Sequence, residues 1–248
     1  MVEHVRPVRK ACKPEASSHL NLRFKVESHH GARGARPLSP MIDHVPYSPT
    51  ESTGQIRRRL RRARALLPAA TLHANSIAIA RHAQCCLRRL APRTLAGYFG
   101  IRGEINLTEL LRRQSALGVR IAMPVLERHR AGGMHFRLWA PDHRLCRNGF
   151  GIPEPCPKAP RIWRRELDLV LLPLVAFDAR GHRLGMGGGY YDRYFASRRV
   201  GTGGPRPRLI GVAHAFQQVH PLEKQPWDVP LDGIITEHGW SWFRRGER

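Results

Sequence analysis

The chain has 248 residues, enough for one large α/β domain or two small ones. Its formal net charge is +23, with 42 lysines and arginines, nearly all arginine, against 19 acidic residues. No apolar stretch is long enough to cross a membrane and the charged N-terminus lacks a signal-peptide core, so we expect no membrane partner. A basic surface attracts polyanions, but no helix-turn-helix, zinc-finger or RNA-binding motif accompanies the charge, and we expect no specific nucleic acid.

Residues 1–53 differ in composition from the rest of the chain. Segments such as "HHGARGARPLSP" and "VPYSPTESTG" are rich in proline, glycine and serine and lack apolar periodicity. The sequence therefore predicts a disordered N-terminal extension over residues 1–53 and a single α/β domain over residues 54–248.

The five cysteines form neither a CxxC pair nor a Cys/His zinc spacing. An odd and scattered set predicts reduced structural thiols and a cytoplasmic protein. Adjacent Cys85 and Cys86 lie in a helical segment, where we expect small, partly buried side chains and not a redox pair.

The ordered part begins with an amphipathic helix, "GQIRRRLRRARALLP", in which apolar residues recur at helical spacing. Pro68 separates it from a second helix, "ATLHANSIAIARHAQCCLRRL", and "TLAGYF" then predicts a strand. In "GEINLTELLRRQSALG" the pair Asn106 and Glu109 resembles a capping box, and Gly118 is a typical helix stop. The apolar segments "VRIAMPVL", "MHFRLWA", "LDLVLLPLVAF", "RLIGVAHA" and "DGIITE" predict further strands. Strands alternating with helices favour an α/β domain with a largely parallel sheet.

A glycine-rich loop lies in "RLGMGGGYYDRYF", residues 183–195, between a buried strand and a helical segment. A flexible surface loop is the simpler interpretation, but the order strand, glycines, helix favours backbone N–H groups that receive a phosphate. The loop lacks the Gly-Lys-Ser/Thr ending of a Walker motif, and Tyr190 stands where the dinucleotide motif needs a glycine. The sequence therefore predicts a phosphate-binding loop of another kind.

Five segments occur in a familiar order: "YFGIRGEINLTELL", "NGFGIPEP", "LPLVAFDARGHRLGMGGGYYDRYF", "IGVAHAFQQ" and "WDVPLDGIITE". With them the chain, over residues 54 to about 238, resembles the 5-formyltetrahydrofolate cyclo-ligase family, also called 5,10-methenyltetrahydrofolate synthetases. The resemblance implies a three-layer α/β/α sandwich of the NagB/RpiA/CoA-transferase-like kind. It also implies an ATP- and Mg²⁺-dependent ring closure by a monomer.

The implied chemistry begins at the formyl oxygen, which is a poor leaving group. Phosphoryl transfer from ATP to that oxygen gives an iminium phosphate, N10 attacks, and 5,10-methenyltetrahydrofolate, ADP and phosphate result. Such a transfer depends on positioning and on neutralising charge, so amides, cations and Mg²⁺ are the expected groups.

The resemblance also assigns site residues. The implied ATP site comprises Arg57, Arg58, Arg59, Leu60, Arg61, Arg183, Leu184, Gly185, Met186, Gly187, Gly188, Gly189, Tyr190 and Tyr191, with Arg57 in place of the family's lysine. The implied folate site comprises Phe99, Glu104, Phe150, Met186, Gly187, Gly188, Gly189 and Tyr190, with Tyr190 and Glu104 as catalytic residues. Asp192 and Asp228 are the implied Mg²⁺ ligands.

Each assignment has a simpler alternative. Arg57 and Arg61 also suit a solvated helix face, Asp192 a helix start, and Asp228 a proline-flanked turn. Glu104 also suits an exposed turn, and the two phenylalanines ordinary core packing. For the whole chain, the alternatives are a basic nucleic-acid-binding protein and another nucleotide or sugar-phosphate enzyme on the same fold.

Overall fold

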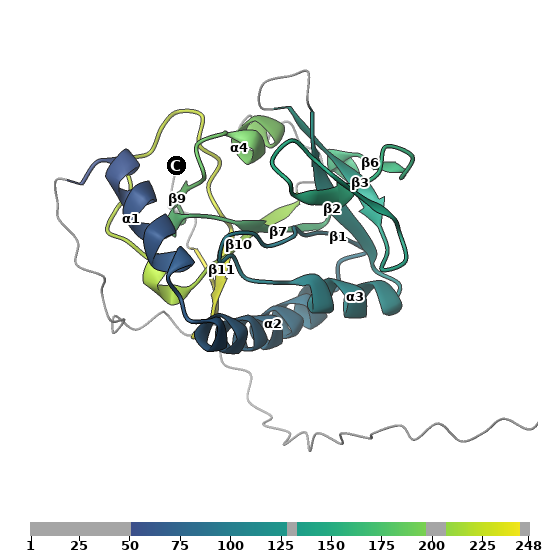
Figure 1. Ribbon diagram of the computed structural model, residues 1–248, viewed down its shortest axis with the longest axis horizontal. Coiled ribbons are helices and arrows are strands. Elements are labelled where there is room, and N and C mark those ends of the chain that lie inside the picture. Colours follow the sequence, from purple (N-terminus) through teal and green to yellow (C-terminus); the bar gives the residue numbers. More distant parts are fainter. Residues whose placement is uncertain (1–50, 128–132, 197–206, 244–248) are drawn as a thin grey trace, which may run out of the picture. The chain divides into compact units, whose positions relative to one another are not determined.

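An eight-stranded sheet, in the order β12-β11-β10-β7-β1-β2-β3-β6, forms the centre of the structure (Figure 1). The structure is a computed structural model that describes residues 51–127, 133–196 and 207–243. The strands are β1 Thr94–Ala96, β2 Arg120–Leu126, β3 Met134–Trp139, β6 Arg161–Ile162, β7 Leu169–Pro173, β10 Arg208–Val212, β11 Gly233–Thr236 and β12 Gly239–Trp242. The predicted extension, residues 1–53, lies outside the described residues apart from its last three.

The middle of the sheet is parallel and its edges are antiparallel. Strand β1 pairs in parallel with β2 and β7, and β10 pairs in parallel with β7 and β11. Strand β12 runs antiparallel to β11 at one edge, and β3 and β6 are antiparallel at the other. Residues 169–172 of β7 are buried on both faces, which explains the unbroken apolar run of that segment. The predicted α/β fold with a largely parallel sheet is confirmed.

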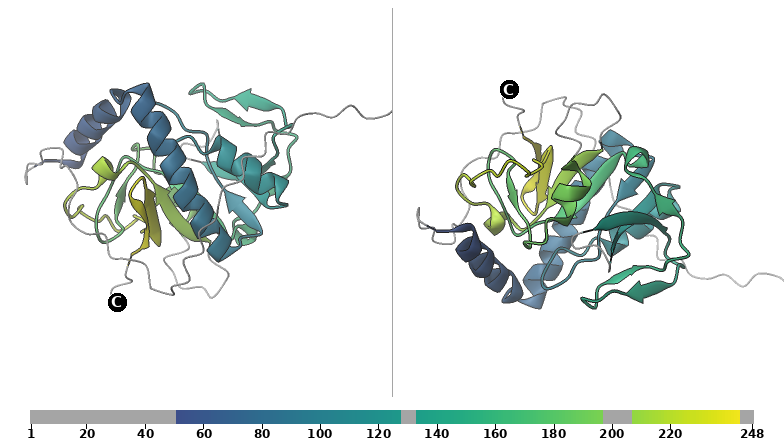
Figure 2. Two further views of the ribbon diagram at one scale, coloured as in Figure 1. Left: turned by 90° about the horizontal axis from the view of Figure 1, so that it is seen from below. Right: turned by 90° about the horizontal axis from the view of Figure 1, so that it is seen from above.

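Helices cover both faces of this sheet. The helices are α1 Thr53–Ala65, α2 Ala69–Leu90, α3 Thr108–Ala116 and α4 Tyr190–Tyr194, with 3₁₀ turns η1 Arg164–Glu166 and η3 Ala215–Gln217. Figure 1 shows α2 and α3 below the sheet and α4 above it, and the view from below in Figure 2 shows α2 crossing its face. Two apolar cores follow from this arrangement. Ile79 and Leu111 belong to the lower core and Phe195 to the upper one, with alternate strand residues on each side.

Helix α1 packs on a different part of the molecule. Its apolar residues Ile56 and Leu60 lie against Val175, Ala176 and Leu184 of a two-stranded hairpin. The hairpin consists of β8 (Ala176–Phe177) and β9 (Arg183–Leu184), and the glycine-rich loop follows β9 directly. The packing of α1 therefore places its arginines beside that loop.

Two details of the α2–α3 region test the predicted helix signals. The prediction of a capping box at Asn106 is wrong, because helix α3 begins at Thr108 without a side-chain cap. Asn106 Oδ1 instead accepts a hydrogen bond from Thr108 N at 2.9 Å, and Glu109 pairs with Arg113 on the helix surface. Gly118 has a φ of +85°, which confirms the helix stop.

The prediction of reduced thiols is wrong for one pair. Cys146 and Cys156 form a disulfide at a Cα–Cα distance of 5.2 Å, at the base of a hairpin of β4 (Leu145–Arg147) and β5 (Pro153–Pro155). The turn that brings the two residues together has no strong signal in the sequence. Cys85 is exposed and Cys86 is buried. Burial raises the pKa of the Cys86 thiol to about 11, which makes it unreactive.

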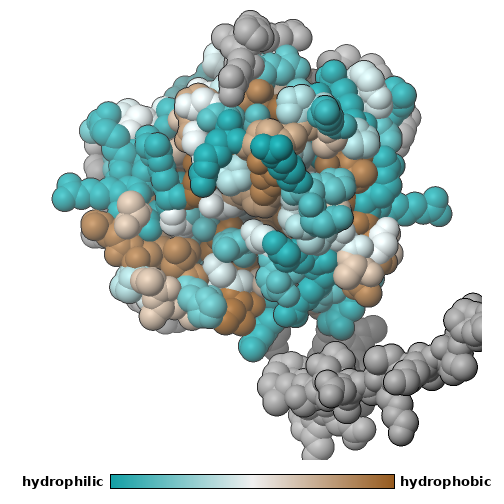
Figure 3. Space-filling view, turned by 45° about the vertical axis from the view of Figure 1, so that its right-hand side comes forward, coloured by the Kyte–Doolittle hydropathy of each residue, from teal (hydrophilic) through white to brown (hydrophobic). Residues whose placement is uncertain are grey.

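Polar side chains cover much of the face shown in Figure 3, with smaller apolar areas between them. Among the described residues, no helix is both long enough and apolar enough to cross a membrane.

Candidate active site

The glycine-rich loop runs from Gly185 to Gly189 and leads into α4. Gly187 has a φ of +103° and Gly189 a φ of +61°, conformations that favour glycine. A Cβ on Gly188 would lie 2.6 Å from Cε2 of Tyr190, so a side chain there would displace the Tyr190 ring. A Cβ on Gly187 would meet nothing within 4 Å, so the backbone there faces open space. The loop therefore exposes backbone groups instead of covering them.

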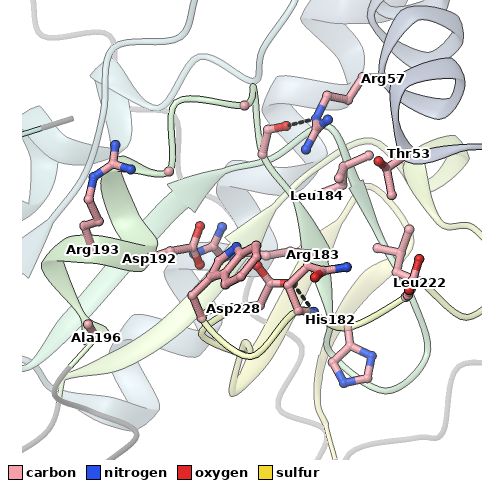
Figure 4. Close-up of a pocket in the computed structure, with 16 residues that line it drawn as sticks. Thr53, Arg57, His182, Arg183, Leu184, Asp192, Arg193, Ala196, Leu222 and Asp228 are labelled. Carbon is pink, nitrogen blue, oxygen red and sulfur yellow. Dashed lines mark hydrogen bonds and ion pairs between the residues drawn. The ribbon is translucent and has the colours of Figure 1, made fainter. Parts of the chain in front are cut away.

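This loop borders a cavity of about 510 Å³, whose lining is shown in Figure 4. The lining combines α1, the glycine-rich loop, α4 and the segment 222–228, which are far apart in the sequence. It comprises Thr53, Arg57, His182, Arg183, Leu184, Gly185, Gly187, Gly189, Asp192, Arg193, Ala196, Leu222, Glu223, Gln225, Trp227 and Asp228. Basic groups, glycine amides and carboxylates thus meet in one place.

The arginines of α1 do not share one environment. Arg57 lines the cavity, and its Nε donates to the carbonyl oxygen of Gly185 at 3.0 Å. Arg59 forms an ion pair with Glu51 at 2.7 Å, and Leu60 is 1% exposed in the core. A second cavity of about 470 Å³ is lined by Arg58, Arg61, Arg62, Arg64, Ala65, Arg102 and Gly103. Of the five residues implied for ATP in α1, the structure brings only Arg57 to the glycine-rich loop.

The two aspartates implied for Mg²⁺ line the same cavity. Asp192 Oδ1 accepts a hydrogen bond from Arg183 Nη2 at 2.7 Å and from Val229 N at 3.1 Å. Asp228 Oδ2 accepts from Gln225 N at 2.9 Å. The described residues contain no cluster of three or more His, Cys, Asp or Glu side chains that could hold a metal ion alone. Two carboxylates fit Mg²⁺, which binds few protein ligands when phosphates supply the others.

Glu104, the predicted folate-binding and catalytic residue, lies in the turn 101–104 and does not line the cavity of about 510 Å³. Its side chain is 7% exposed; Oε1 is 3.4 Å from Nη2 of Arg64, and Oε2 accepts from Ile101 N at 3.2 Å. Burial raises the pKa of Glu104, and Arg64 opposes that shift. Burial likewise lowers the pKa of Arg64, whose guanidinium also donates to the carbonyls of Arg102 and Leu174. Each charge is therefore stabilised by the other and by backbone hydrogen bonds, which oppose the cost of burial.

Two tyrosines, Tyr98 and Tyr191, lie within electrostatic reach of Glu104. Burial raises the pKa of Tyr98 and of Tyr191, and the negative charge of Glu104 raises both further. Tyr191 belongs to α4, so Glu104 lies within electrostatic reach of the helix that follows the loop. Among the described residues, the Tyr98 hydroxyl has no hydrogen-bond partner.

The aromatic residues implied for folate have three different environments. Tyr190 is partly buried, and the Arg193 guanidinium carbon lies 5.8 Å from its ring centroid. Phe99 packs on the lower core and meets Trp139 edge to face at 5.7 Å. Phe150 is 68% exposed at the tip of the β4–β5 hairpin, and Met186 is 41% exposed. The structure therefore does not gather these four side chains into one wall.

Sequence reasoning missed several residues of the site. Trp227 and His182 line the cavity, and Trp227 directly precedes Asp228 in the segment "WDVP". Arg64, the partner of Glu104, lies in an arginine-rich segment, so its residue type does not distinguish it from its neighbours.

A mostly parallel sheet beside a cavity lined by glycines, arginines and carboxylates defines an α/β protein with a candidate active site. Residues 49–237 match the model of the 5-formyltetrahydrofolate cyclo-ligase family, and the chain belongs to this family. The chain is accordingly a ligase of folate metabolism.

Curated relatives support the assignment. The chain is 34% identical over 188 residues to the 5-formyltetrahydrofolate cyclo-ligase of Haemophilus influenzae, covering 75% of this chain and 98% of the relative. It is 34% identical over 151 residues to that of Escherichia coli K12, covering 60% and 81%. The structure of Aquifex aeolicus 5,10-methenyltetrahydrofolate synthetase is similar with a TM-score of 0.66 and 27% identity, covering 79% and 95%. The fold of a Mycoplasma pneumoniae synthetase is similar with a TM-score of 0.61.

Proposed function

We propose that this cyclo-ligase closes the ring of 5-formyltetrahydrofolate with consumption of ATP and with Mg²⁺. The γ-phosphoryl group moves to the formyl oxygen, N10 attacks the resulting iminium carbon, and phosphate leaves with the former formyl oxygen. The observation that carries the proposal is the meeting of the glycine-rich loop, Arg57, Asp192 and Asp228 at one cavity. Phosphoryl transfer needs this combination of amides, cations and carboxylates.

In this proposal the cavity is the nucleotide side of the site. The backbone amides from Gly185 to Gly189 bind phosphate oxygens, and Arg57 neutralises part of their charge. Asp192 and Asp228 hold Mg²⁺, which supplies further charge neutralisation when bound. The hydrogen bond from Arg57 to the Gly185 carbonyl fixes the cation beside the loop before ATP arrives.

Glu104 and Tyr190 form the folate side. A buried carboxylate suits the donor-rich edge of a pterin because hydrogen bonds to a charged acceptor are strong. The pairing of Glu104 with Arg64 leaves it able to accept additional hydrogen bonds. Tyr190 directly follows the glycine-rich loop, and in this proposal it contacts the formyl group. Phe99 supplies apolar surface, and Phe150 takes part from the exposed hairpin tip.

We further propose that the protein acts as a cytoplasmic monomer without nucleic acid. All residues assigned to the reaction come from one chain, so a second copy is not needed. Elution of the active protein at the mass of one chain tests this, and a dimer as the sole active species contradicts it.

The decisive experiment is an absorbance assay with purified protein, 5-formyltetrahydrofolate, ATP and Mg²⁺. We expect the methenyl product to appear in the near ultraviolet, and ADP to form only when the folate is present. Arg59→Ala, which removes a partly buried ion pair with Glu51 away from the cavity, is the matched control for Arg57→Ala. ADP formation without folate points to another nucleotide enzyme, and no product from folded protein overturns the proposal.

A further inference from the structure

His214 lies behind the folate side of the site, directly after β10. Its side chain is 0% exposed. The ring Nε2 is 3.1 Å from the carbonyl oxygen of Gly103, and Nδ1 is 3.0 Å from Nδ2 of Asn75 in α2. A carbonyl can only accept, so Nε2 carries the proton and Nδ1 accepts from the Asn75 amide. One neutral form of the ring satisfies both partners.

The imidazole is fixed by more than these two bonds. His214 N donates to Gln217 Oε1 at 2.9 Å, and Gln217 Nε2 donates to the carbonyls of Leu174 and Val175. The ring stacks on Phe216 with a centroid distance of 5.3 Å and an interplanar angle of 18°. His214 therefore acts as a rigid support for whatever it contacts.

Its contact is the turn that carries Glu104. Arg102 adopts a φ of +48°, which is rare for a residue other than glycine, and Gly103 a φ of +78°. A Cβ on Gly103 would lie 2.5 Å from the carbonyl oxygen of Arg64, so the turn presses closely on α1. The Gly103 carbonyl that His214 holds belongs to the peptide bond joining Gly103 to Glu104. The orientation of this peptide bond sets the direction in which the Glu104 side chain projects.

We infer that His214 is a positioning residue for Glu104. The neutral imidazole of His214 holds the 101–104 turn in the conformation that presents the Glu104 carboxylate to the folate. This inference rests on the proposed role of Glu104. His214 acts through the Gly103 carbonyl and does not touch the substrate. Its loss therefore affects folate binding and leaves the ATP side unchanged.

The same geometry predicts a dependence on pH. A protonated ring has N–H groups at both positions, and the Nδ1–H group then faces Nδ2 of Asn75, which also donates, so this hydrogen bond is lost as the two groups stand. Burial lowers the pKa of His214, and the positive charge of Arg64 in α1 lowers it further. The hydrogen bond to Gly103 and the negative charge of Glu237, which follows β11, oppose this shift. Protonation therefore begins below the ordinary range of histidine and loosens the turn. We expect the KM for folate to rise only at pH values below the ordinary titration range of histidine, because the ring stays neutral down to that range.

Steady-state kinetics of His214→Leu and His214→Gln test the inference. Leucine removes both hydrogen bonds, so we expect the KM for 5-formyltetrahydrofolate to rise about tenfold or more while the KM for ATP changes less than about twofold. Glutamine has a donor and an acceptor, so it restores most of the folate affinity. Because an amide does not titrate, this variant also loses the part of the low-pH rise of the folate KM that comes from His214, and keeps the part that comes from protonation of Glu104, whose pKa burial raises. His73→Gln, an exposed histidine of α2, is the control and keeps the wild-type pH profile.

The possible outcomes separate this inference from the proposed function. Equal rises of both KM values in His214→Leu, an unchanged folate KM, or a wild-type pH profile in His214→Gln each overturn the positioning role. If His214→Leu does not fold, the glutamine variant and the wild-type pH profile decide. Glu104→Gln tests the underlying proposal by itself. If it impairs folate binding and the His214 variants do not, only the positioning role is wrong; if it has no effect, the proposed role of Glu104 is wrong.

Discussion

The two sides of the site differ in how firmly the chain holds them. On the nucleotide side, Gly187 and Gly188 are exposed and a side chain at Gly187 would meet nothing within 4 Å. On the folate side, the 101–104 turn is held by Arg64, by His214 and by contact with α1. The first side leaves its amides open for a ligand, and the second is already organised before one arrives. In the proposed function, the packed side is the one that orients the folate.

The electrostatics of the two sides differ in the same way. Arg57 and the two aspartates line an open cavity, where water reduces the cost of each charge. Glu104 and Arg64 have side chains only 7% and 2% exposed, and burial shifts both pKa values toward the neutral form. Charges of the second kind are sensitive to any change in their partner. Mutations on the nucleotide side should therefore affect activity, and mutations on the folate side also stability.

The largest expected effect comes from two glycine substitutions that compare the sides directly. Gly103→Ala places a methyl group 2.5 Å from the Arg64 carbonyl at a φ of +78°, so we expect a loss of about 3 kcal/mol or more in the free energy of unfolding. Gly187→Ala meets no atom within 4 Å and adds only backbone strain, about 1 kcal/mol. Denaturant unfolding of both variants measures the difference. Equal losses of stability would show that the two sides are held alike.

Asp192→Asn tests whether the nucleotide side acts through charge. Asparagine keeps an oxygen that can accept from Arg183 and from Val229 N, so the fold should survive. The loss of a hard anionic ligand should lower the rate by about 10²-fold or more, and a higher Mg²⁺ concentration should restore part of it. Asp142→Asn, an exposed aspartate outside the cavity, is the control. A stable Asp192→Asn variant with wild-type kinetics across a Mg²⁺ titration removes Asp192 from the metal site.

A smaller effect separates two neighbouring arginines of α1. Arg57→Ala removes the cation beside Gly185, so we expect the KM for ATP to rise about tenfold, equivalent to one charge-assisted contact. Arg59→Ala removes an ion pair with Glu51 whose members are 23% and 14% exposed, and should cost less than about 1 kcal/mol of stability with unchanged kinetics. ATP titrations of the two variants measure the contrast. Similar KM values for both would mean that Arg57 is a surface charge like the others.

The fold could be predicted from the sequence because its signals are local. Buried parallel strands need continuous apolar segments, as in "LDLVLL". The cluster of glycines that follows indicates a loop, because glycines are unfavourable inside a strand or a helix. The disulfide could not be predicted, since it depends on a turn between Cys146 and Cys156 that spacing does not reveal. The failed capping box at Asn106 shows that the same residue pattern also serves a local turn.

That the glycine-rich loop and Asp192 lie at one cavity follows from the sequence in the same way, because the two are neighbours in the chain. The folate side depends on contacts between distant segments. Arg64 is 40 positions before Glu104, and His214 is 111 positions after Gly103. In a chain so rich in arginine, residue type alone cannot show which one is buried. Only the fold identifies Arg64 and His214 as partners of that turn.

The smallest expected effect concerns the start of α1, which carries Arg57. Ser52 Oγ accepts from Gln55 N at 3.4 Å and Gln55 Oε1 accepts from Ser52 N at 2.8 Å, a capping box that satisfies amides at the start of the helix. Because the sequence predicts no packed structure before this point, removal of residues 1–50 should leave melting temperature and kinetics unchanged. Removal of residues 1–53 also takes the cap and Glu51, and should cost about 1 kcal/mol of stability with a small rise in the KM for ATP. Thermal unfolding and ATP titration of the two truncated proteins measure this difference. A large fall in melting temperature after removal of residues 1–50 would show that this segment supports the nucleotide side. The contrast between an open nucleotide side and a supported folate side would then be wrong.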